Sequence, residues 1–295
     1  MQVFSDLRAG LTISDEQQRA GRQRLRVAVL LGMQLGQPEA LLVNPTLRSP
    51  DTGNISRRRR EALADIALRY GVPIIEDDAY GMLPQDAPPP LASRAPELPY
   101  CISGLSKCVG AGLRTGYPCA PDKRAAQRLA GALWATSVMA SPVTNALATR
   151  WVSDRTAEAM LQAVWDESRA RQALAALHLA GFAVAAQPAG FHLWRPLDVA
   201  QPAAINAVDL SAHLRAQGVA AVASAAFCTD GDPPDAIHLC LGGSVSREQC
   251  GQALQLVART LGDAQPGLLK QQAASGSVPV KPAPGETRPS GHPVH

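Results

Sequence analysis

A strand, a helix and a second strand follow one another early in this chain, and they constrain its fold more than any other segment. Ala40-Leu41-Leu42-Val43 is a short apolar run of the kind that forms a buried strand. Ser56 is placed to cap a helix that runs from about Arg57 to Tyr70, and Gly71 ends it. Val72 to Ile75 gives the next strand. Strands joined through a helix lie parallel in one sheet, so the sequence predicts an α/β fold with a mostly parallel sheet.

The rest of the chain continues this alternation and then changes character. Further strands are expected at Tyr100–Ile102, Gly116–Ala120, Phe191–Trp194 and Ile237–Leu241. A helical stretch is expected from Asp122 to a break at Ser141-Pro142, and further helices at Thr156–Leu179, Val208–Gln217 and Ser246–Leu261. The last segment is rich in proline, glycine and serine, with too little apolar surface to offset the entropy of ordering. We therefore expect a diverged leader (1–36), part of a large α/β domain (37–150), a connecting helix with a small α+β domain (151–262), and a disordered tail (263–295).

Composition excludes several classes of protein. With 295 residues, 46% of them hydrophobic and 18% charged, the chain has an ordinary globular composition and enough length for two cores. A formal net charge of +3 is too small to argue for nucleic acid or an anionic membrane as partner. The apolar run Val27–Leu31 is far shorter than the roughly 20 residues of a membrane span. No secretion signal is evident at the N-terminus, so we expect a cytoplasmic protein without membrane contact.

Two further sequence features point to no separate function. The six cysteines form neither a CxxC pair nor a metal-finger spacing, so we expect reduced thiols and no metal site. The basic run Arg57-Arg58-Arg59-Arg60 invites a nucleic-acid interpretation. No aromatic residues interleave with it and no wider basic face supports it, so direct nucleic-acid binding by this chain is not expected.

One lysine stands in a setting suited to covalent chemistry. Lys107 follows the small residues of Ser103-Gly104-Leu105-Ser106, and Arg114 comes seven residues later. A lysine that forms a Schiff base needs small neighbours that admit a flat cofactor and a fixed cation for its phosphate. Upstream, an apolar strand ends in Glu76-Asp77-Asp78, followed by Tyr80, and open α/β sheets place ligands at the carboxyl ends of their strands. The two segments together predict a pyridoxal phosphate site.

Each of these residues also has an interpretation without chemistry. Lys107 is alternatively a surface lysine, and Arg114 the partner in a surface salt bridge. Asp77 is alternatively a cap, since it shares its stretch with two other acids, and Tyr80 a core residue.

From about Leu41 to Leu261 the chain resembles the aminotransferase-like domain of the class I/II, fold-type I family, and most of all the version found in MocR-type regulators of the GntR group. The matching segments are Ser49-Pro50-Asp51-Thr52-Gly53, Glu76-Asp77-Asp78-Ala79-Tyr80, Leu105-Ser106-Lys107, Gly112-Leu113-Arg114, Ala140-Ser141-Pro142, Phe191-His192-Leu193-Trp194, Ile237–Gly242 and Ser246-Arg247-Glu248-Gln249. The resemblance implies a large α/β domain that binds pyridoxal phosphate in a mostly parallel sheet between helices, a smaller C-terminal α+β domain, and a homodimer. It also implies amino-group transfer between an amino acid and a 2-oxo acid, as part of amino acid metabolism.

The resemblance also implies a role for each matching site residue. Lys107 would hold pyridoxal phosphate as a Schiff base and later move the substrate's α-proton. Asp77 would pair with the pyridine nitrogen, and Tyr80 would hydrogen-bond the ring's phenolic oxygen. Ser106 and Arg114 would contact the phosphate, Arg114 through charge-assisted hydrogen bonds.

Three departures from the family pattern bear on catalysis. Ser49 stands where the family has an asparagine that donates to the phenolic oxygen of the ring. His238 stands where the family has an arginine that binds the substrate carboxylate, and histidine is neither bidentate nor permanently charged. Alternatively, His238 is an ordinary histidine whose hydrogen bonds are satisfied within its strand, and His192 is likewise expected to pack in its strand. Residues 1–40 show no Gly- and Ser/Thr-bearing phosphate loop. The alternatives to an aminotransferase are therefore a non-catalytic effector-sensing domain related to MocR-type regulators, or a protein that has lost its cofactor.

Overall fold

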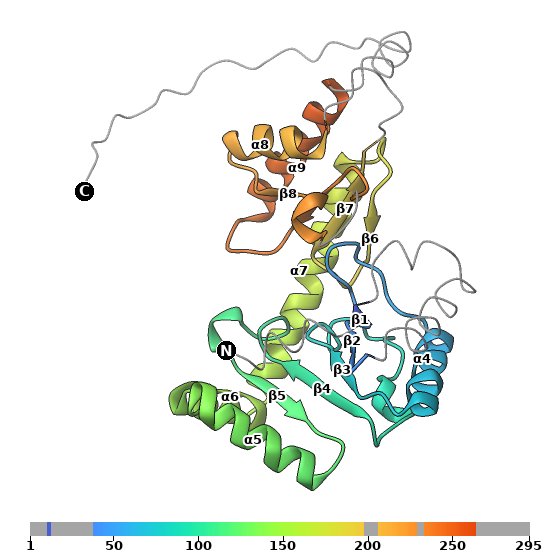
Figure 1. The fold of residues 1–295 in the computed structure, drawn as a ribbon. Helices are drawn as coiled ribbons and strands as arrows, with labels where there is room; N and C mark the ends of the chain where they lie inside the picture. The colour runs from blue at the N-terminus through green and yellow to red at the C-terminus, as the bar shows by residue number, and fades with distance from the viewer. Residues whose placement is uncertain (1–10, 13–37, 198–205, 229–232, 264–295) are drawn as a thin grey trace, which may run out of the picture.

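Two β-sheets and the helices around them form the molecule (Figure 1). The structure is a computed structural model that describes residues 11–12, 38–197, 206–228 and 233–263. The first sheet has the strand order β1-β2-β3-β4-β5, and the second has the order β6-β7-β9-β8. None of the helices within these ranges is long and apolar enough to cross a membrane.

The first sheet confirms the predicted α/β fold. Its strands are β1 (Leu11–Thr12), β2 (Leu41–Val43), β3 (Ile74–Asp77), β4 (Pro99–Gly104) and β5 (Gly116–Cys119). The first four pair in parallel, and β5 is antiparallel to β4. Parallel strands end at one edge of a sheet, so the loops that follow β3 and β4 lie beside each other.

Helix α4 (Arg57–Tyr70) connects β2 to β3, with the bounds that the sequence predicted. It buries Leu63 and Ile66 against the apolar side chains of β2 and β3. Gly71 ends it in a left-handed conformation, with φ of 65°, and donates its backbone N–H to the last turn. Ser56 stands at the N-cap as expected, but its side chain makes no capping hydrogen bond.

A series of helices leads from the first sheet to the second. These are α5 (Lys123–Ser137), α6 (Pro142–Ser153) and α7 (Thr156–His178), and short 3₁₀ helices lie at η2 (Leu91–Ser93), η3 (Ala111–Leu113) and η4 (Ser224–Phe227). Helix α7 spans the distance between the sheets (Figure 1). Leu161 and Val164 near its start pack beside the loop after β3, whereas Ala175 near its end belongs to the core of the second sheet.

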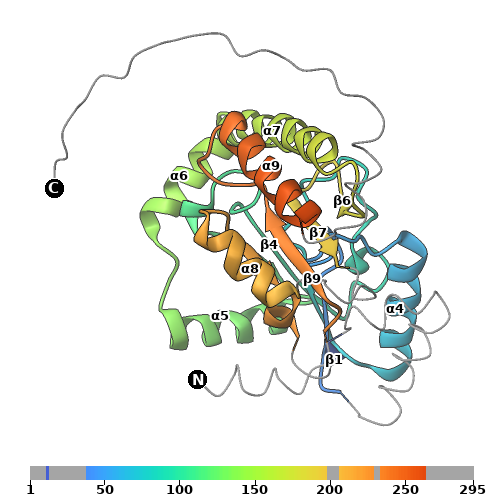
Figure 2. The same cartoon turned by 90° about the horizontal axis from the view of Figure 1, so that it is seen from above.

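The second sheet is antiparallel and builds a core of its own. It contains β6 (Ala185–Ala186), β7 (His192–Pro196), β8 (Ala221–Ala223) and β9 (Ala236–Cys240). Helix α8 (Ala207–Ala216) lies between β7 and β8 in the chain, and α9 (Arg247–Asp263) follows β9. Helices α8 and α9 cover one face of β7 and β9 (Figure 2). Leu193, Ile237 and Leu239 point into the core beneath them, where Leu210 and Leu254 are also buried.

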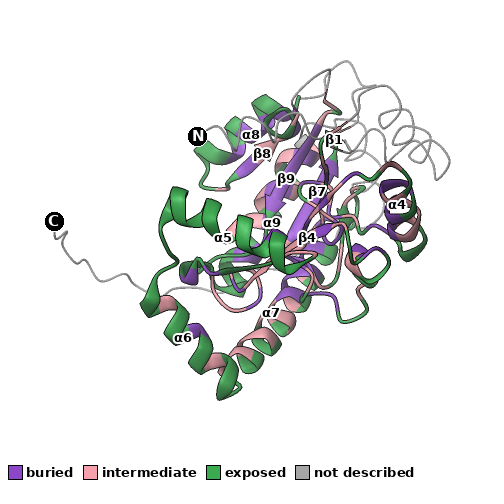
Figure 3. Ribbon diagram, turned by 60° about the horizontal axis from the view of Figure 1, so that its bottom comes forward, coloured by how far each residue is buried: buried purple, intermediate pink, exposed green. Residues whose placement is uncertain are grey.

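Helices α5 and α6 are largely uncovered (Figure 3). All four residues of β5 are exposed, and α5 and α6 are exposed over most of their length. Large apolar side chains stand open there, among them Trp134, Met139, Val143 and Val152.

Most of the predicted leader and tail lies outside the described residues. Within residues 1–36 the structure describes the two residues of β1, and of residues 263–295 it describes Asp263, which still belongs to α9. The short strands β6 and β8 were not predicted.

Candidate functional site

Lys107 lies in the turn directly after β4, at the edge of the sheet where ligands of such folds bind. The turn is held by backbone hydrogen bonds from Leu105 N–H to the Thr115 carbonyl and from Val109 N–H to the Leu105 carbonyl. The half-buried Lys107 places its Nζ 5.1 Å from the centroid of the Tyr80 ring. The structure therefore brings together two residues that the sequence analysis took from separate segments.

Tyr80 connects this turn to the second sheet. It lies in the loop after β3, is buried, and packs against Phe191 with ring centroids 5.9 Å apart. Its hydroxyl lies 3.0 Å from Nε2 of His192, the first residue of β7. This contact joins the loop that carries Tyr80 to a strand more than a hundred residues further along the chain.

The three consecutive acids at the end of β3, Glu76, Asp77 and Asp78, have different surroundings. The Glu76 carboxylate is fully buried and accepts hydrogen bonds from the backbone N–H groups of Leu91 and Ala92, so it holds η2 on the sheet. Burial raises the pKa of the Asp78 carboxyl, which a hydrogen bond from Thr46 partly offsets. Asp77 is half-buried, follows Glu76 on the opposite face of β3, and accepts no side-chain hydrogen bond from the described residues. Asp77 thus has a free carboxylate among the described residues, and Oδ1 of Asp78 is buried without a hydrogen-bond partner there.

The residues assigned to the phosphate and to the ring oxygen are more open. Ser106 is half-buried beside Lys107, whereas Arg114 and Ser49 are exposed. Arg114 adopts the left-handed conformation, with φ of 50°, at the end of η3. Within the described ranges, the side chains of Arg114 and Ser49 make no hydrogen bond or ion pair, and the structure does not bring them into contact with Lys107. The leader that would carry a phosphate loop lies outside those ranges.

His238 lies on β9 beside β7, on the face that looks away from α8 and α9. The register pairs Trp194 with His238 across the two strands. Since side chains alternate along a strand, His192, Trp194 and His238 share one face, and the leucine and isoleucine residues between them face the core. The ring centroids of His192 and His238 are 4.9 Å apart, and Phe227 meets His238 edge-on at 5.4 Å.

Both imidazoles are neutral near pH 7. Burial above all, with smaller effects from His238 and Lys107, lowers the pKa of His192 to about 4. Burial alone lowers the pKa of His238. The sequence analysis assigned His192 to strand packing and thereby missed its contact with Tyr80. No sequence signal identifies it, because the contact depends on how the second sheet sits against the loop after β3.

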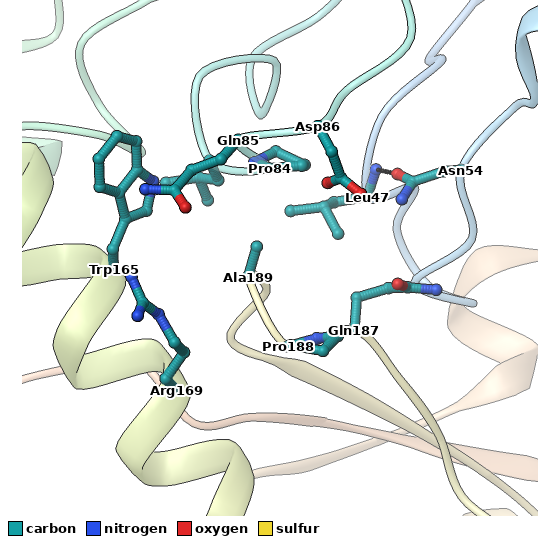
Figure 4. Close-up of a pocket in the computed structure, with 11 residues that line it drawn as sticks. Leu47, Asn54, Pro84, Gln85, Asp86, Trp165, Arg169, Gln187, Pro188 and Ala189 are labelled. Atoms are coloured by element: carbon teal, nitrogen blue, oxygen red, sulfur yellow. Dashed lines mark hydrogen bonds between the residues drawn. The ribbon is translucent and has the colours of Figure 1, made fainter.

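The described part of the chain also contains a cavity of about 460 Å³, whose lining residues are drawn in Figure 4. Its walls come from the loops after β2 and β3, from α7 and from the segment before β7, and they include Leu47, Leu83, Trp165, Arg169 and Pro188. Leu47 and Leu83 also belong to the apolar cluster that contains Tyr80, so the cavity borders that cluster. The cavity contains none of the predicted site residues. Among the described residues, no cluster of three or more His, Cys, Asp or Glu side chains could hold a metal ion.

The polar side chains at and near Lys107 are of the kinds that bind an aromatic aldehyde cofactor. The primary amine of Lys107 lies over the phenol of Tyr80, and the carboxylate of Asp77, which accepts no hydrogen bond from the described residues, stands at the end of β3 beside β4. An aldehyde, a ring hydroxyl and a pyridine nitrogen are the groups of pyridoxal phosphate that such side chains bind. The residues present therefore fit this cofactor at its reactive ring, with Ser106 nearest to supply a contact for its phosphate.

Comparison with known proteins defines the family. Residues 28–257 match the model of the aminotransferase class I and II family, and the chain belongs to that family. Its sequence is similar to the uncharacterized HTH-type transcriptional regulator YdeF of Bacillus subtilis, with 25% identity over 226 residues, which is 76% of this chain and 48% of that regulator. It is also 30% identical to the regulator YisV of the same organism over 119 residues, 39% of this chain and 24% of that protein. The chain spans about half the length of YdeF, and the match to YisV covers about a quarter of that protein. The predicted resemblance to such regulators is confirmed.

Solved structures show the same fold. An archaeal alanine:glyoxylate aminotransferase superposes with a TM-score of 0.70 at 22% identity, over 82% of this chain and 60% of that one. A kynurenine aminotransferase of Pyrococcus horikoshii, solved with PMP, superposes with a TM-score of 0.71 at 18% identity, over 83% and 61%. The fold is therefore that of the fold-type I pyridoxal phosphate-dependent transferases, as predicted.

Proposed function

We propose that this chain is an aminotransferase-like domain that binds pyridoxal phosphate at Lys107 and exchanges amino groups between small amino and oxo compounds. The observation that carries the proposal is the position of the Lys107 amine, 5.1 Å from the centroid of the Tyr80 ring, beside the strand that ends in Asp77. When bound, the cofactor supplies an acceptor for the electrons of the substrate's α carbon. Amino acids and 2-oxo acids are the substrate class that the family suggests.

The residues of the chain would each perform a distinct task. The Lys107 amine would bond to the aldehyde carbon, with loss of water, and would later accept and return the proton at the ligand's α carbon. The Asp77 carboxylate would pair with the ring nitrogen and keep it protonated. Ser106 and Arg114 would hold the phosphate, Arg114 by its permanent charge.

Tyr80 orients the ring oxygen with help from His192. With the proton of His192 on Nε2, the imidazole donates to the Tyr80 oxygen, and the phenol's own proton is free to point to the cofactor. The opposite tautomer makes Tyr80 donate to His192 and removes this donor from the cofactor. His192 is thus a positioning residue for Tyr80.

A second candidate function is effector sensing without turnover. Two observations favour it: similar proteins are HTH-type regulators, and His238 offers no permanent charge where the family binds a carboxylate. In this case Lys107 would hold the cofactor, a ligand amine would either bind beside it or take the place of the lysine on the aldehyde carbon, and binding rather than product release would be the output. A homodimer and a cytoplasmic location are proposed with either function; the open apolar side chains of α5 and α6 support the homodimer.

The test is a titration of the purified chain with pyridoxal phosphate, followed by borohydride reduction and peptide mapping. We expect a visible absorbance band and a label on the peptide that contains Lys107. Lys107→Ala should abolish both, whereas Lys123→Ala, which removes the exposed lysine that begins α5, should leave them unchanged. A label elsewhere, or no band at saturating cofactor, would refute cofactor binding at this site.

A further step separates the two functions. Amino compounds are added to the loaded protein, and the pyridoxamine form is measured by chromatography after denaturation. Its accumulation supports amino-group transfer, whereas ligand binding without it supports sensing.

A further inference from the structure

We propose that His192 and His238 form a recognition subsite for an uncharged polar group, so that the preferred ligands are amines with a neutral α substituent, such as a carboxamide, and not free α-amino acids. This inference rests on the proposed function, because it describes the ligand that meets Lys107.

The position of the histidine pair follows from a continuous set of contacts. The Lys107 amine stands over the ring of Tyr80, the Tyr80 hydroxyl meets His192, and His192 lies against His238 with an angle of 31° between their rings. Phe227, which is 40% exposed, borders His238 on its outer side. A ligand held by its amino group at Lys107 therefore has its neighbouring substituent near this pair.

The face that carries the pair has unused hydrogen-bonding capacity. His192 and His238 are 9% and 7% exposed, and His192 Nδ1 and His238 Nε2 have no hydrogen-bond partner among the described residues. Nε1 of Trp194, on the same face of β7, is buried and equally unpartnered there. Buried polar atoms of folded proteins nearly always have partners, so three such nitrogens on one sheet face indicate a place for a polar ligand group.

The sheet face that carries His192 and His238 has no net charge, and this determines which ligand group can bind there. Burial lowers the pKa of both histidines, so they contact a ligand as neutral imidazoles near pH 7. Lys107 is the cation that acts on His192, and the proposed function commits its amine to the cofactor. A carboxylate placed here would lose its water without gaining a charged partner, which is costly. A carboxamide carries donors and an acceptor that match neutral imidazoles and an indole N–H.

The test compares L-alaninamide with L-alanine, which differ only in the α substituent. The readout is the proton NMR signals of the two imidazoles, assigned with His192→Gln and His238→Gln, near neutral pH in the protein loaded with pyridoxal phosphate. We expect L-alaninamide to shift both signals at a concentration about tenfold or more below that of L-alanine, because burying an unpaired charge is disfavoured. Equal or tighter binding of L-alanine, or no shift with either compound, would overturn the inference.

Two variants make the result specific to His238. His238→Arg supplies a permanently charged fork for a carboxylate and should move the preference toward L-alanine. His238→Gln keeps a neutral polar group, should retain the preference for the amide, and serves if the arginine variant does not fold. An unchanged preference in folded His238→Arg would contradict the inference. Failure of the proposed function is seen separately, as absent cofactor binding at Lys107, whereas failure of the inference is seen in the protein that carries the cofactor, as equal or tighter binding of L-alanine.

Discussion

His192 should make the stability of this protein depend on pH. Its pKa is about 4 in the folded protein, compared with an ordinary value of 6.5. Between these values the unfolded chain takes up a proton that the folded protein rejects, so the free energy of unfolding falls as the pH falls from about 6.5 toward 4. At about 1.4 kcal/mol per pH unit, the full gap corresponds to about 3 kcal/mol. Above pH 6.5 the effect vanishes, because both states carry a neutral imidazole.

The assay is urea unfolding at a series of pH values for the wild type and for His192→Gln. Glutamine keeps a polar group for the Tyr80 hydroxyl but does not titrate. We expect the wild type to lose up to about 1.4 kcal/mol more per pH unit than the variant across this window. His213→Gln, which removes an exposed imidazole from α8, is the matched control.

The comparison is made between variants because other groups titrate in the same range. His238, Lys107 and Tyr80 face His192, and the lowered pKa of His238 acts in the same direction. Parallel pH profiles for wild type and His192→Gln would refute the reasoning, since they would mean that folding does not shield His192 from protonation. The neutral subsite inferred above would then lose its electrostatic support.

Other parts of the fold give sharp expectations. Arg60 is buried and donates to three backbone carbonyls and a threonine hydroxyl, so Arg60→Met should cost about 3 kcal/mol in urea unfolding, whereas exposed Arg57→Ala should cost about 0.5 kcal/mol or less. Gly71→Ala should lower the unfolding free energy by about 1 kcal/mol in thermal denaturation, because φ is 65° there. Burial first, and a neighbouring carboxylate second, raise the pKa of Cys101 to about 12, so mass spectrometry should find it alkylated far more slowly than Cys119, which is exposed on the paired strand. The account of Arg60 would be contradicted if Arg57→Ala lowered the unfolding free energy as much as Arg60→Met does. The accounts of Gly71 and Cys101 would be contradicted by an unchanged unfolding free energy of Gly71→Ala and by equal alkylation rates of Cys101 and Cys119.

The sequence was most informative where local chemistry decides the structure. Helix α4 has the predicted bounds because its apolar period is regular and Gly71 supplies the left-handed end. The parallel arrangement of β2 and β3 follows from the helix between them. By contrast, β6 and β8 consist mostly of alanine and valine in two- and three-residue stretches, and they are strands only because β7 and β9 pair with them.

Part of the candidate site was equally accessible to sequence analysis. The sequence analysis placed the segment with Tyr80 and the turn with Lys107 in one predicted site, and the Lys107 amine lies 5.1 Å from the centroid of the Tyr80 ring, because β3 and β4 are parallel neighbours. The contact between Tyr80 and His192 was not predictable, since it depends on the packing of one sheet against a loop of the other. The basic run on α4 shows the same limit: Arg60 is buried as a hydrogen-bond donor, which no local pattern distinguishes from its exposed neighbours.

Helix α7 connects the two parts of the site, the loop that carries Tyr80 and the strand that carries His192. It enters the packing around Tyr80 at one end and the core beneath β7 at the other, over a length of about 34 Å. A continuous helix of this kind gives His192 a high effective concentration at Tyr80, whereas a flexible connection would dilute it. A break in the middle of α7 would therefore weaken the histidine subsite without altering any residue that forms it.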